Sequence, residues 1–284
     1  MIGILSKEVN HEFVKKLDMP VDIIKEDSFP DISGLFIDWV PKLPNSEDAW
    51  LKQASLLQYY IKKDIPIVIF DRYFYLNEKE VNWIKKFNVS LFEPALNSGR
   101  QGFRYLPEWI DSLEIKTEYN DEREYDLIYS GIDYNISEFE KWIAEYAMLF
   151  TDKKVAYSMN SLLSEFKREE YKTKNLNEID LGYTVGKTTL AIDSKKSYQR
   201  GYFDSRYFDA MRNGCLPFLP IQHKYFHGLF NGLIIEDIKE LDLHVSMFSK
   251  LKDTIIEEIF ERIKSDWNEF TIEHAIDVIR NCLE

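Results

Sequence analysis

The sequence predicts an α/β protein made of two Rossmann-like domains that face each other across a cleft. Short, wholly apolar runs alternate with amphipathic stretches along most of the 284 residues, which indicates parallel strands covered by helices on both faces. The alternation fades between residues 94 and 124 and then resumes, which indicates a domain boundary. Because single cores stop growing at about 250–300 residues, we predict two domains, 1–117 and 118–284.

Each expected strand is a short apolar run, and each expected helix shows apolar residues at a spacing of three or four. In the first domain we expect strands at 2–5, 21–24, 34–40, 66–70 and 89–92, and helices at 12–17, 45–63 and 77–87. In the second we expect strands at 125–130, 155–157, 189–192, 216–219 and 232–235, and helices at 137–150, 160–168 and 205–213. Two or three helices follow between 236 and 283. The apolar face of the last one fits packing on its own domain or a return to the first domain.

Composition and charge narrow the function classes. Hydrophobic residues make up 45% and charged residues 30%, and nowhere do 18 apolar residues run together, so we expect no membrane association. Cys215 and Cys282 have no metal-site spacing, which favours a reducing cytoplasm. The net charge of −13 disfavours nucleic acid partners.

The acidity is uneven along the chain. Residues 151–200 carry ten basic and seven acidic side chains. Eight of the basic residues form either a positively charged surface that binds a phosphate backbone or ordinary solvated surface: Lys153, Lys154, Lys167, Arg168, Lys172, Lys174, Lys195 and Lys196.

Two motifs resemble known sites and fail on spacing. Gly186-Lys187-Thr188-Thr189 lacks the earlier glycine and the preceding strand of a phosphate-binding loop, so we interpret it as a surface loop. His223 and His227 are four residues apart, but neither the zinc-protease glutamate nor a third ligand accompanies them. We therefore predict no metal site.

Residues 198–219 carry the most information about a ligand. Here a short helix leads directly into an apolar strand, with Arg206 in its first turn and Asp209 three residues later. A cation is unfavourable at a helix N-terminus, so an anionic ligand in front of the helix explains Arg206, and Asp209 is placed to bind a ribose diol. An Arg–Asp ion pair on a solvated face is the alternative.

These residues give the chain a resemblance to the GT-B glycosyltransferases. The opening strand Ile2–Leu5 and the pair Phe70-Asp71 match phage DNA β-glucosyltransferases of the T4 type and, more distantly, the CgeB-like group. The remaining matches are Tyr105-Leu106-Pro107, Asp126–Gly131, Tyr198, Arg206 and Asp209. The arginines that follow the Tyr-x-Gly strand in the phage enzymes are replaced here by residues 132–135, and Asp209 stands where Glu is usual.

The resemblance implies roles for individual residues. It makes Asp71 the catalytic base of an inverting hexosyl transfer, and a carboxylate at a strand end is chemically suited to that. It assigns donor binding to Ser130, Gly131, Tyr198, Arg206 and Asp209. An ion pair between Asp71 and Arg72 is the alternative for the base, and a ligand-free turn is the alternative for Ser130 and Gly131.

The resemblance also implies the substrates. The implied donor is a UDP-sugar, and the phage enzymes that the chain resembles indicate UDP-glucose. The resemblance implies no cofactor. The chain lacks the Asp-x-Asp metal ligand of the other main glycosyltransferase fold, so a divalent metal is not implied. The resemblance implies a 5-hydroxymethylpyrimidine in phage DNA as the acceptor, with the chain then in the host cytoplasm. The net charge favours a protein, a glycan or a small molecule instead. A non-catalytic module that binds a nucleotide sugar is the competing function.

Overall fold

The computed structural model describes most of the chain. The described residues are 1–5, 13, 21–23, 29–39, 47–72, 74–110, 122–130, 138–150, 152–158, 173–175, 183–190, 199–203, 206–221, 223–231 and 233–284. Nearly all of the expected helix 12–17 and the whole of the expected helix 160–168 lie outside these residues.

The chain divides into two compact units. The first contains Met1–Asp111 together with Glu269–Glu284, and the second contains Ser112–Asn268. The domain boundary expected at 117–118 lies outside the described residues. None of the helices in the described part of the chain is long and apolar enough to span a lipid bilayer.

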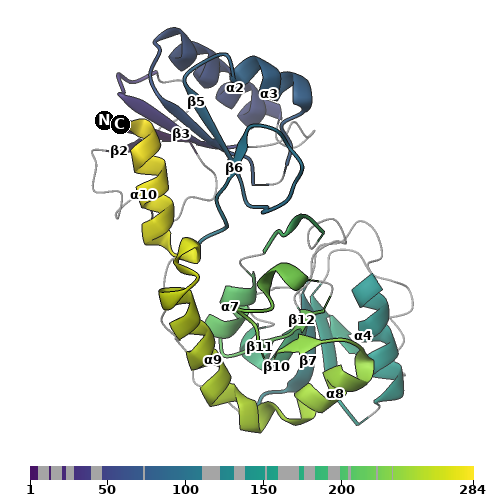
Figure 1. The fold of residues 1–284 in the computed structure, drawn as a ribbon. Coiled ribbons are helices and arrows are strands. Elements are labelled where there is room, and N and C mark those ends of the chain that lie inside the picture. Colours follow the sequence, from purple (N-terminus) through teal and green to yellow (C-terminus); the bar gives the residue numbers. More distant parts are fainter. Residues whose placement is uncertain are drawn as a thin grey trace. The chain divides into compact units, whose positions relative to one another are not determined.

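The first unit is a parallel sheet with strand order β2-β1-β3-β4-β5-β6 (Figure 1). Its strands are β1 (Ile2–Leu5), β2 (Val21–Ile23), β3 (Gly34–Asp38), β4 (Ile67–Phe70), β5 (Val89–Glu93) and β6 (Phe103–Tyr105). Its helices are α2 (Glu47–Lys62), α3 (Glu78–Ile84) and α10 (Ile272–Leu283). Strand β6 was not expected from the sequence. It pairs with β5 in parallel although the loop between them contains no helix.

Both faces of this sheet are buried, as its wholly apolar strands predict. Alternate residues of β4 face opposite sides: Ile67 and Ile69 pack with α2 and α3, whereas Val68 and Phe70 pack with α10. Strands enclosed in this way hold the side chains at their ends in fixed positions.

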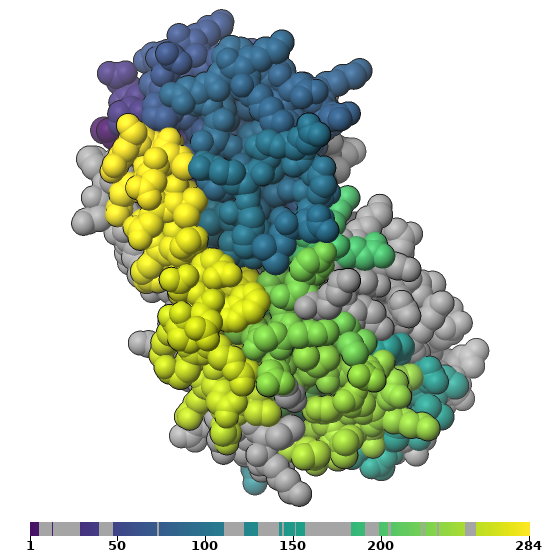
Figure 2. Space-filling model, viewed as in Figure 1, coloured from purple at the N-terminus to yellow at the C-terminus, as the bar shows by residue number. Residues whose placement is uncertain are grey.

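The C-terminal helix α10 packs on the sheet of the first unit. Thr271 caps it by accepting a hydrogen bond from the His274 amide, and its apolar face joins the core below β3 and β4. A Cβ atom on Gly34 would lie 3.3 Å from Leu283, so the end of α10 approaches β3 closely. The two chain ends lie side by side in Figure 1, and α10 covers part of the first unit in Figure 2.

The second unit contains a five-stranded parallel sheet with order β11-β10-β7-β8-β9 and a small parallel pair, β12-β13. The strands are β7 (Tyr125–Ser130), β8 (Val155–Ser158), β9 (Thr173–Asn175), β10 (Gly186–Leu190), β11 (Leu216–Pro217), β12 (Leu219–Pro220) and β13 (Ile234–Ile235). The helices are α4 (Glu138–Leu149), α7 (Arg206–Arg212), α8 (Ile238–Ser246) and α9 (Phe248–Ser265), with 3₁₀ turns η3 (Lys224–Phe226) and η4 (Asn268–Phe270).

Strand β10 corrects the interpretation of residues 186–189 as a surface loop. These residues form the strand between β7 and β11, and Thr188 and Thr189 are fully buried. Gly186 is required because an added Cβ would lie 2.6 Å from Cγ2 of Ile128 on β7. Arg123 further fixes this region by donating hydrogen bonds to the carbonyl oxygens of Gly186 and Asn213.

The Gly186 contact predicts the effect of one added methyl group. Gly186→Ala should lower the free energy of unfolding by about 2 kcal/mol, because overpacking a tight core costs about 1–3 kcal/mol. Urea unfolding measures this. Gly228→Ala is the control, since its Cβ would meet Trp267 at an ordinary 3.5 Å. In an Ile128→Ala background the methyl group has room, so an equal loss there would contradict the explanation.

Candidate functional site

The carboxyl ends of β3, β4 and β5 carry charged residues at one edge of the first sheet. Asp38 ends β3, Asp71 and Arg72 follow β4, and Glu93 ends β5. All three carboxylates are buried. Because ligands of open α/β sheets bind outside the carboxyl ends of the strands, this edge is the candidate site of the first unit.

Asp71 is completely buried and holds the turn that leads from β4 to α3. Its Oδ1 accepts a hydrogen bond from the Tyr75 amide at 2.8 Å. Its Oδ2 accepts one from the Leu76 amide at 2.9 Å and one from Arg100 Nη2 at 2.7 Å. A carboxylate oxygen has two lone-pair sites, so Oδ1 retains one acceptor site with respect to the described residues.

Arg100 is the ion-pair partner of Asp71. The alternative interpretation of Asp71 as a member of an ion pair is therefore correct in kind, but Arg72 is not the partner. The Arg100 guanidinium also binds Glu93 at 2.9 Å and the Leu76 carbonyl oxygen at 2.6 Å. It lies 3.9 Å from the centre of the Phe103 ring, a cation–π distance. This residue thus links the carboxyl ends of β4 and β5 to the start of β6.

Glu93 shares the Arg100 guanidinium with Asp71. Burial raises the pKa of Glu93 above its ordinary value, and the Asp71 charge acts in the same direction. A hydrogen bond from the Ser98 hydroxyl and the charge of Arg100 offset part of that rise. Two carboxylates on one guanidinium leave this part of the edge with an excess of negative charge.

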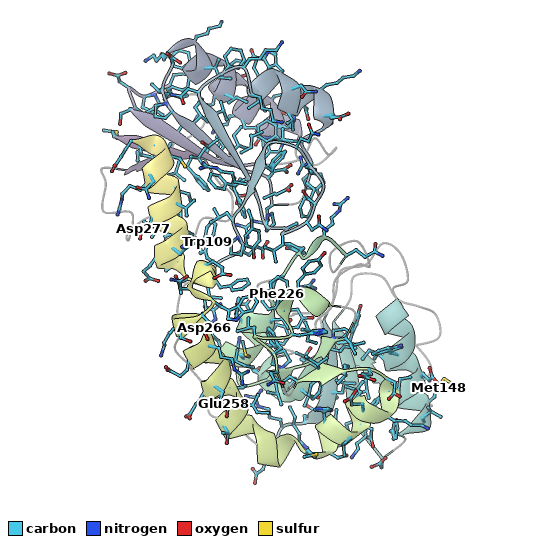
Figure 3. All side chains as sticks on the ribbon, viewed as in Figure 1. Trp109, Met148, Phe226, Glu258, Asp266 and Asp277 are labelled. Carbon is cyan, nitrogen blue, oxygen red and sulfur yellow. The ribbon has the colours of Figure 1, made fainter. Side chains whose placement is uncertain are left out.

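Arg72 organises a second buried group at the same edge. It lies 3.4 Å from both Asp38 and Glu108, and its guanidinium lies 5.9 Å from the centre of the Trp109 ring. Trp109, labelled in Figure 3, stacks on Phe13 and packs against the core that includes α10. The edge therefore holds four buried carboxylates and two arginines.

The predicted donor residues belong to the second unit, and the structure describes three of the five. Ser130 is the last residue of β7, Arg206 is the first residue of α7, and Asp209 lies one turn further along α7. Asp209 forms an ion pair with Arg212. Gly131 and Tyr198 lie outside the described residues. The donor-binding roles of all five remain predictions.

Lys187 has a structural partner rather than a phosphate. Its ammonium lies 2.7 Å from Asp126 on β7, so the resemblance to a phosphate-binding loop has no counterpart in the fold. Burial alone would raise the pKa of Asp126, but the Lys154 amide and the Lys187 ammonium outweigh it and hold that pKa below its ordinary value.

The basic stretch of residues 151–200 is described only in part. Lys153 pairs with Asp152, and Lys174 lies on β9. Five of the eight residues singled out from the sequence lie outside the described residues: Lys167, Arg168, Lys172, Lys195 and Lys196.

His223 and His227 each bind a backbone carbonyl, Tyr202 at 2.8 Å and Ile221 at 2.9 Å. His223 is 4% exposed and packs against Phe226, labelled in Figure 3. Burial lowers the pKa of His223 to about 4. In the described part of the chain, no three His, Cys, Asp or Glu side chains are grouped to hold a metal ion.

Comparisons with known proteins show the fold. No family model and no curated protein matches the chain. Anabaena HepE, solved in complex with UDP and glucose, matches with a TM-score of 0.52 at 8% identity, covering 99% of this chain and 98% of that chain. The glycotransferase of kitacinnamycin matches with a TM-score of 0.46 at 9% identity, covering 100% of this chain and 98% of the other. Together with the parallel sheets, the match to HepE confirms the predicted fold class, two Rossmann-like units of the GT-B type.

The sequence pointed to Asp71 but not to the residues that surround it. Asp38 and Glu93 share with Asp71 the position at the end of an apolar parallel strand, and this pattern could have identified them. Arg100 is flanked by Gly99 and Gly102, both at positive φ, but nothing local relates it to Asp71, 29 residues earlier.

Removing the shared guanidinium should destabilise the first unit. Arg100→Gln leaves Asp71 and Glu93 buried without their cation, and breaking a buried pair in this way costs about 3–5 kcal/mol. Urea unfolding measures the loss. Arg104→Gln is the matched control, because the exposed Arg104 side chain contacts the Phe92 ring and Cys282 but none of the carboxylates that the structure describes. Equal losses in the two variants would contradict the central position of Arg100.

The pKa of His223 predicts a pH-dependent stability. Because the pKa of His223 in the folded chain, about 4, lies below the ordinary histidine value of 6.5, the unfolded chain binds the proton more readily. Stability from this group is complete above pH 6.5 and is lost as the pH falls towards 4, by about 3 kcal/mol.

The matched variant is His223→Gln, which keeps an N–H donor for the Tyr202 carbonyl. Between pH 7 and 4 it should lose less stability than the unaltered chain, measured by urea unfolding. Parallel pH curves for His223→Gln and the unaltered chain would refute the prediction.

Proposed function

We propose that the chain is a glycosyltransferase that moves a hexose from a UDP-sugar to a hydroxyl group of an acceptor. The UDP-sugar in this proposal is UDP-glucose. The observation that carries this proposal is the fold shared with HepE, a protein solved with UDP and glucose. The carboxylate-rich edge of the first sheet supports it, because activating a hydroxyl requires a base.

In the proposed reaction Asp71 acts as the base. The acceptor oxygen attacks the anomeric carbon from the side opposite the diphosphate, and the carbon–oxygen bond to the diphosphate breaks with its electron pair. The hydroxyl proton passes to Asp71 Oδ1, the oxygen that accepts one hydrogen bond from the described residues rather than two. Because Asp71 is completely buried, this step requires the β4–α3 turn to move and expose that oxygen. The sugar is thereby transferred with inversion.

The departing diphosphate requires positive charge. Arg206 at the start of α7 supplies it in this proposal, with the Gly131 amide and Tyr198 as further phosphate ligands. Asp209 binds the ribose diol in this proposal. Ser130, at the end of β7, supplies a backbone amide to the phosphates. The Arg212 partner holds the Asp209 carboxylate in place for that hydrogen bond. Phosphate stabilisation by side chains and amides needs no metal ion.

The decisive experiment follows UDP release from UDP-glucose in water, where hydrolysis replaces transfer. The unaltered chain should release UDP slowly, and Asp71→Asn should release it at least about 100-fold more slowly, the usual loss when a general base is removed. Binding of UDP-glucose should persist in Asp71→Asn, because the proposed donor residues lie in the other unit.

Arg206→Gln separates donor binding from proton transfer. It should weaken UDP-glucose binding by about tenfold or more, since hydrogen bonds to charged groups contribute about 1.5–3 kcal/mol. Tight binding of UDP-glucose with no UDP release over hours would contradict the enzyme and support a non-catalytic binding module.

A further inference from the structure

Two helices on one face of the first sheet contain lysines but no acidic residues over much of their length. Helices α2 and α3 lie next to each other (Figure 1) and share one core, to which Leu57 of α2 and Val81 of α3 contribute. Residues 51–63 contain three lysines and residues 81–88 contain two, and neither range contains aspartate or glutamate. In a chain with a net charge of −13, this layer is a local region of opposite sign.

The lysines gather where the two helices end. The Ile67 amide at the start of β4 donates a hydrogen bond at 3.0 Å to the carbonyl oxygen of Asn88, so the segments that precede β4 and β5 are adjacent. Lys62 and Lys63 at the end of α2 and Lys86 after α3 are all exposed. Cations are favourable at a helix C-terminus, which explains the lysines alone but not the apolar side chains beside them.

The outer sides of the two helices face the same direction. On α2 the exposed residues Leu51, Ser55, Gln58 and Lys62 follow each other at spacings of four, three and four residues, which places them on one side of the helix. Leu57 lies on the opposite side and is buried against the sheet. Because α2 and α3 bury their inner sides in one core, their outer sides form one layer.

This layer exposes large apolar side chains among its lysines. Leu51 is 50% exposed, Trp83 is 40% exposed and Phe87 is 37% exposed. The ring centres of Trp83 and Phe87 lie 5.1 Å apart, so the two rings form one apolar surface. Lys79 precedes Trp83 by one helical turn, Lys86 is next to Phe87 in sequence, and both lysines are exposed. A partner that covers this layer would remove apolar surface from water, which is favourable.

We propose that the outer side of α2 and α3 binds the surface of an anionic lipid bilayer. Its contact residues are Leu51, Lys62, Trp83, Lys86 and Phe87, here called the α2–α3 surface. The lysines are attracted to the negative head groups, and the apolar side chains enter the boundary between head groups and acyl chains. The proposal replaces the expectation of no membrane association, which was based on the absence of an apolar run long enough to span a bilayer.

A bilayer explains the combination of charge and apolar surface better than another polyanion does. A phosphate backbone attracts lysines equally well, but it offers no apolar environment to Leu51. The acidic remainder of the chain is repelled by an anionic bilayer, which favours the orientation with α2 and α3 towards the lipid. The lysines lie near the amino ends of β4 and β5, whereas the candidate site lies at their carboxyl ends, so the inference is independent of the proposed function.

The test is sedimentation of the full chain with lipid vesicles. Vesicles of equal parts phosphatidylcholine and phosphatidylglycerol should bind the chain, and vesicles of phosphatidylcholine alone should not. Salt at about 1 M, which shortens the screening length to about 3 Å, should release most of the bound chain. No binding to the anionic vesicles, or equal binding to both kinds, would overturn the inference.

A matched pair of double variants tests the position of the charge. Lys62→Gln with Lys86→Gln should weaken vesicle binding about 20-fold, since each lysine near an anionic bilayer contributes a factor of about five. Lys239→Gln with Lys264→Gln removes the same charge from α8 and α9 in the second unit and should have little effect. Equal weakening in the two double variants would overturn the inference, because net charge alone would then explain binding.

A second pair tests the apolar contact. Leu51→Ser should weaken vesicle binding about fivefold, because a half-exposed leucine loses roughly half of its full burial free energy. Leu243→Ser removes a similarly exposed leucine from α8 and should leave binding unchanged. Unchanged vesicle binding in Leu51→Ser would overturn the assignment to a bilayer. Binding to duplex DNA that depends on Lys62 and Lys86, without binding to vesicles, would overturn it in favour of nucleic acid.

Discussion

The guanidinium of Arg100 is the interaction on which the candidate site depends. It joins Asp71 at the end of β4 to Glu93 at the end of β5, and it comes from the loop that leads to β6. Buried ion pairs seldom stabilise a fold more than a well-packed apolar group would, because burial strips both charges of water. The arrangement is therefore better explained by the geometry it imposes on the β4–α3 turn than by stability.

That geometry is rigid because the sheet beneath it is enclosed. Successive residues of β4 point alternately into the core shared with α2 and α3 and into the core shared with α10. Phe70, which lies in the core with α10, immediately precedes Asp71. The return of the chain at residue 269 thus contributes directly to the site. Without α10, Val68 and Phe70 would lose one of the elements that cover them and would become more accessible to water.

The sequence predicted the elements whose signal is local and missed those whose signal is not. Fully apolar runs located β4 and β5, and the residue after β4 was recognised as a candidate base. Strands β6 and β9 have three residues each and lie in polar stretches where the apolar alternation has faded, so no pattern marks them. Strand β10 was wrongly interpreted as a loop because Gly186 and Lys187 are typical loop residues. In the fold, Gly186 packs against Ile128 and Lys187 forms an ion pair with Asp126. The pairing of Asp71 with Arg100 depends on strand order, which one-dimensional patterns do not contain.

The two chemical steps of the proposed reaction require groups of opposite charge. Proton abstraction needs an anionic group, whereas the departing diphosphate needs cations, and the two would neutralise each other in one small cluster. Among the described residues of the first unit, carboxylates outnumber arginines at the strand ends, which suits the proposed base. In the second unit, α7 begins at an arginine, which suits the donor. The net charge of −13 is thus a poor guide to either ligand, because each binding edge responds to the few charged groups within several ångströms of it.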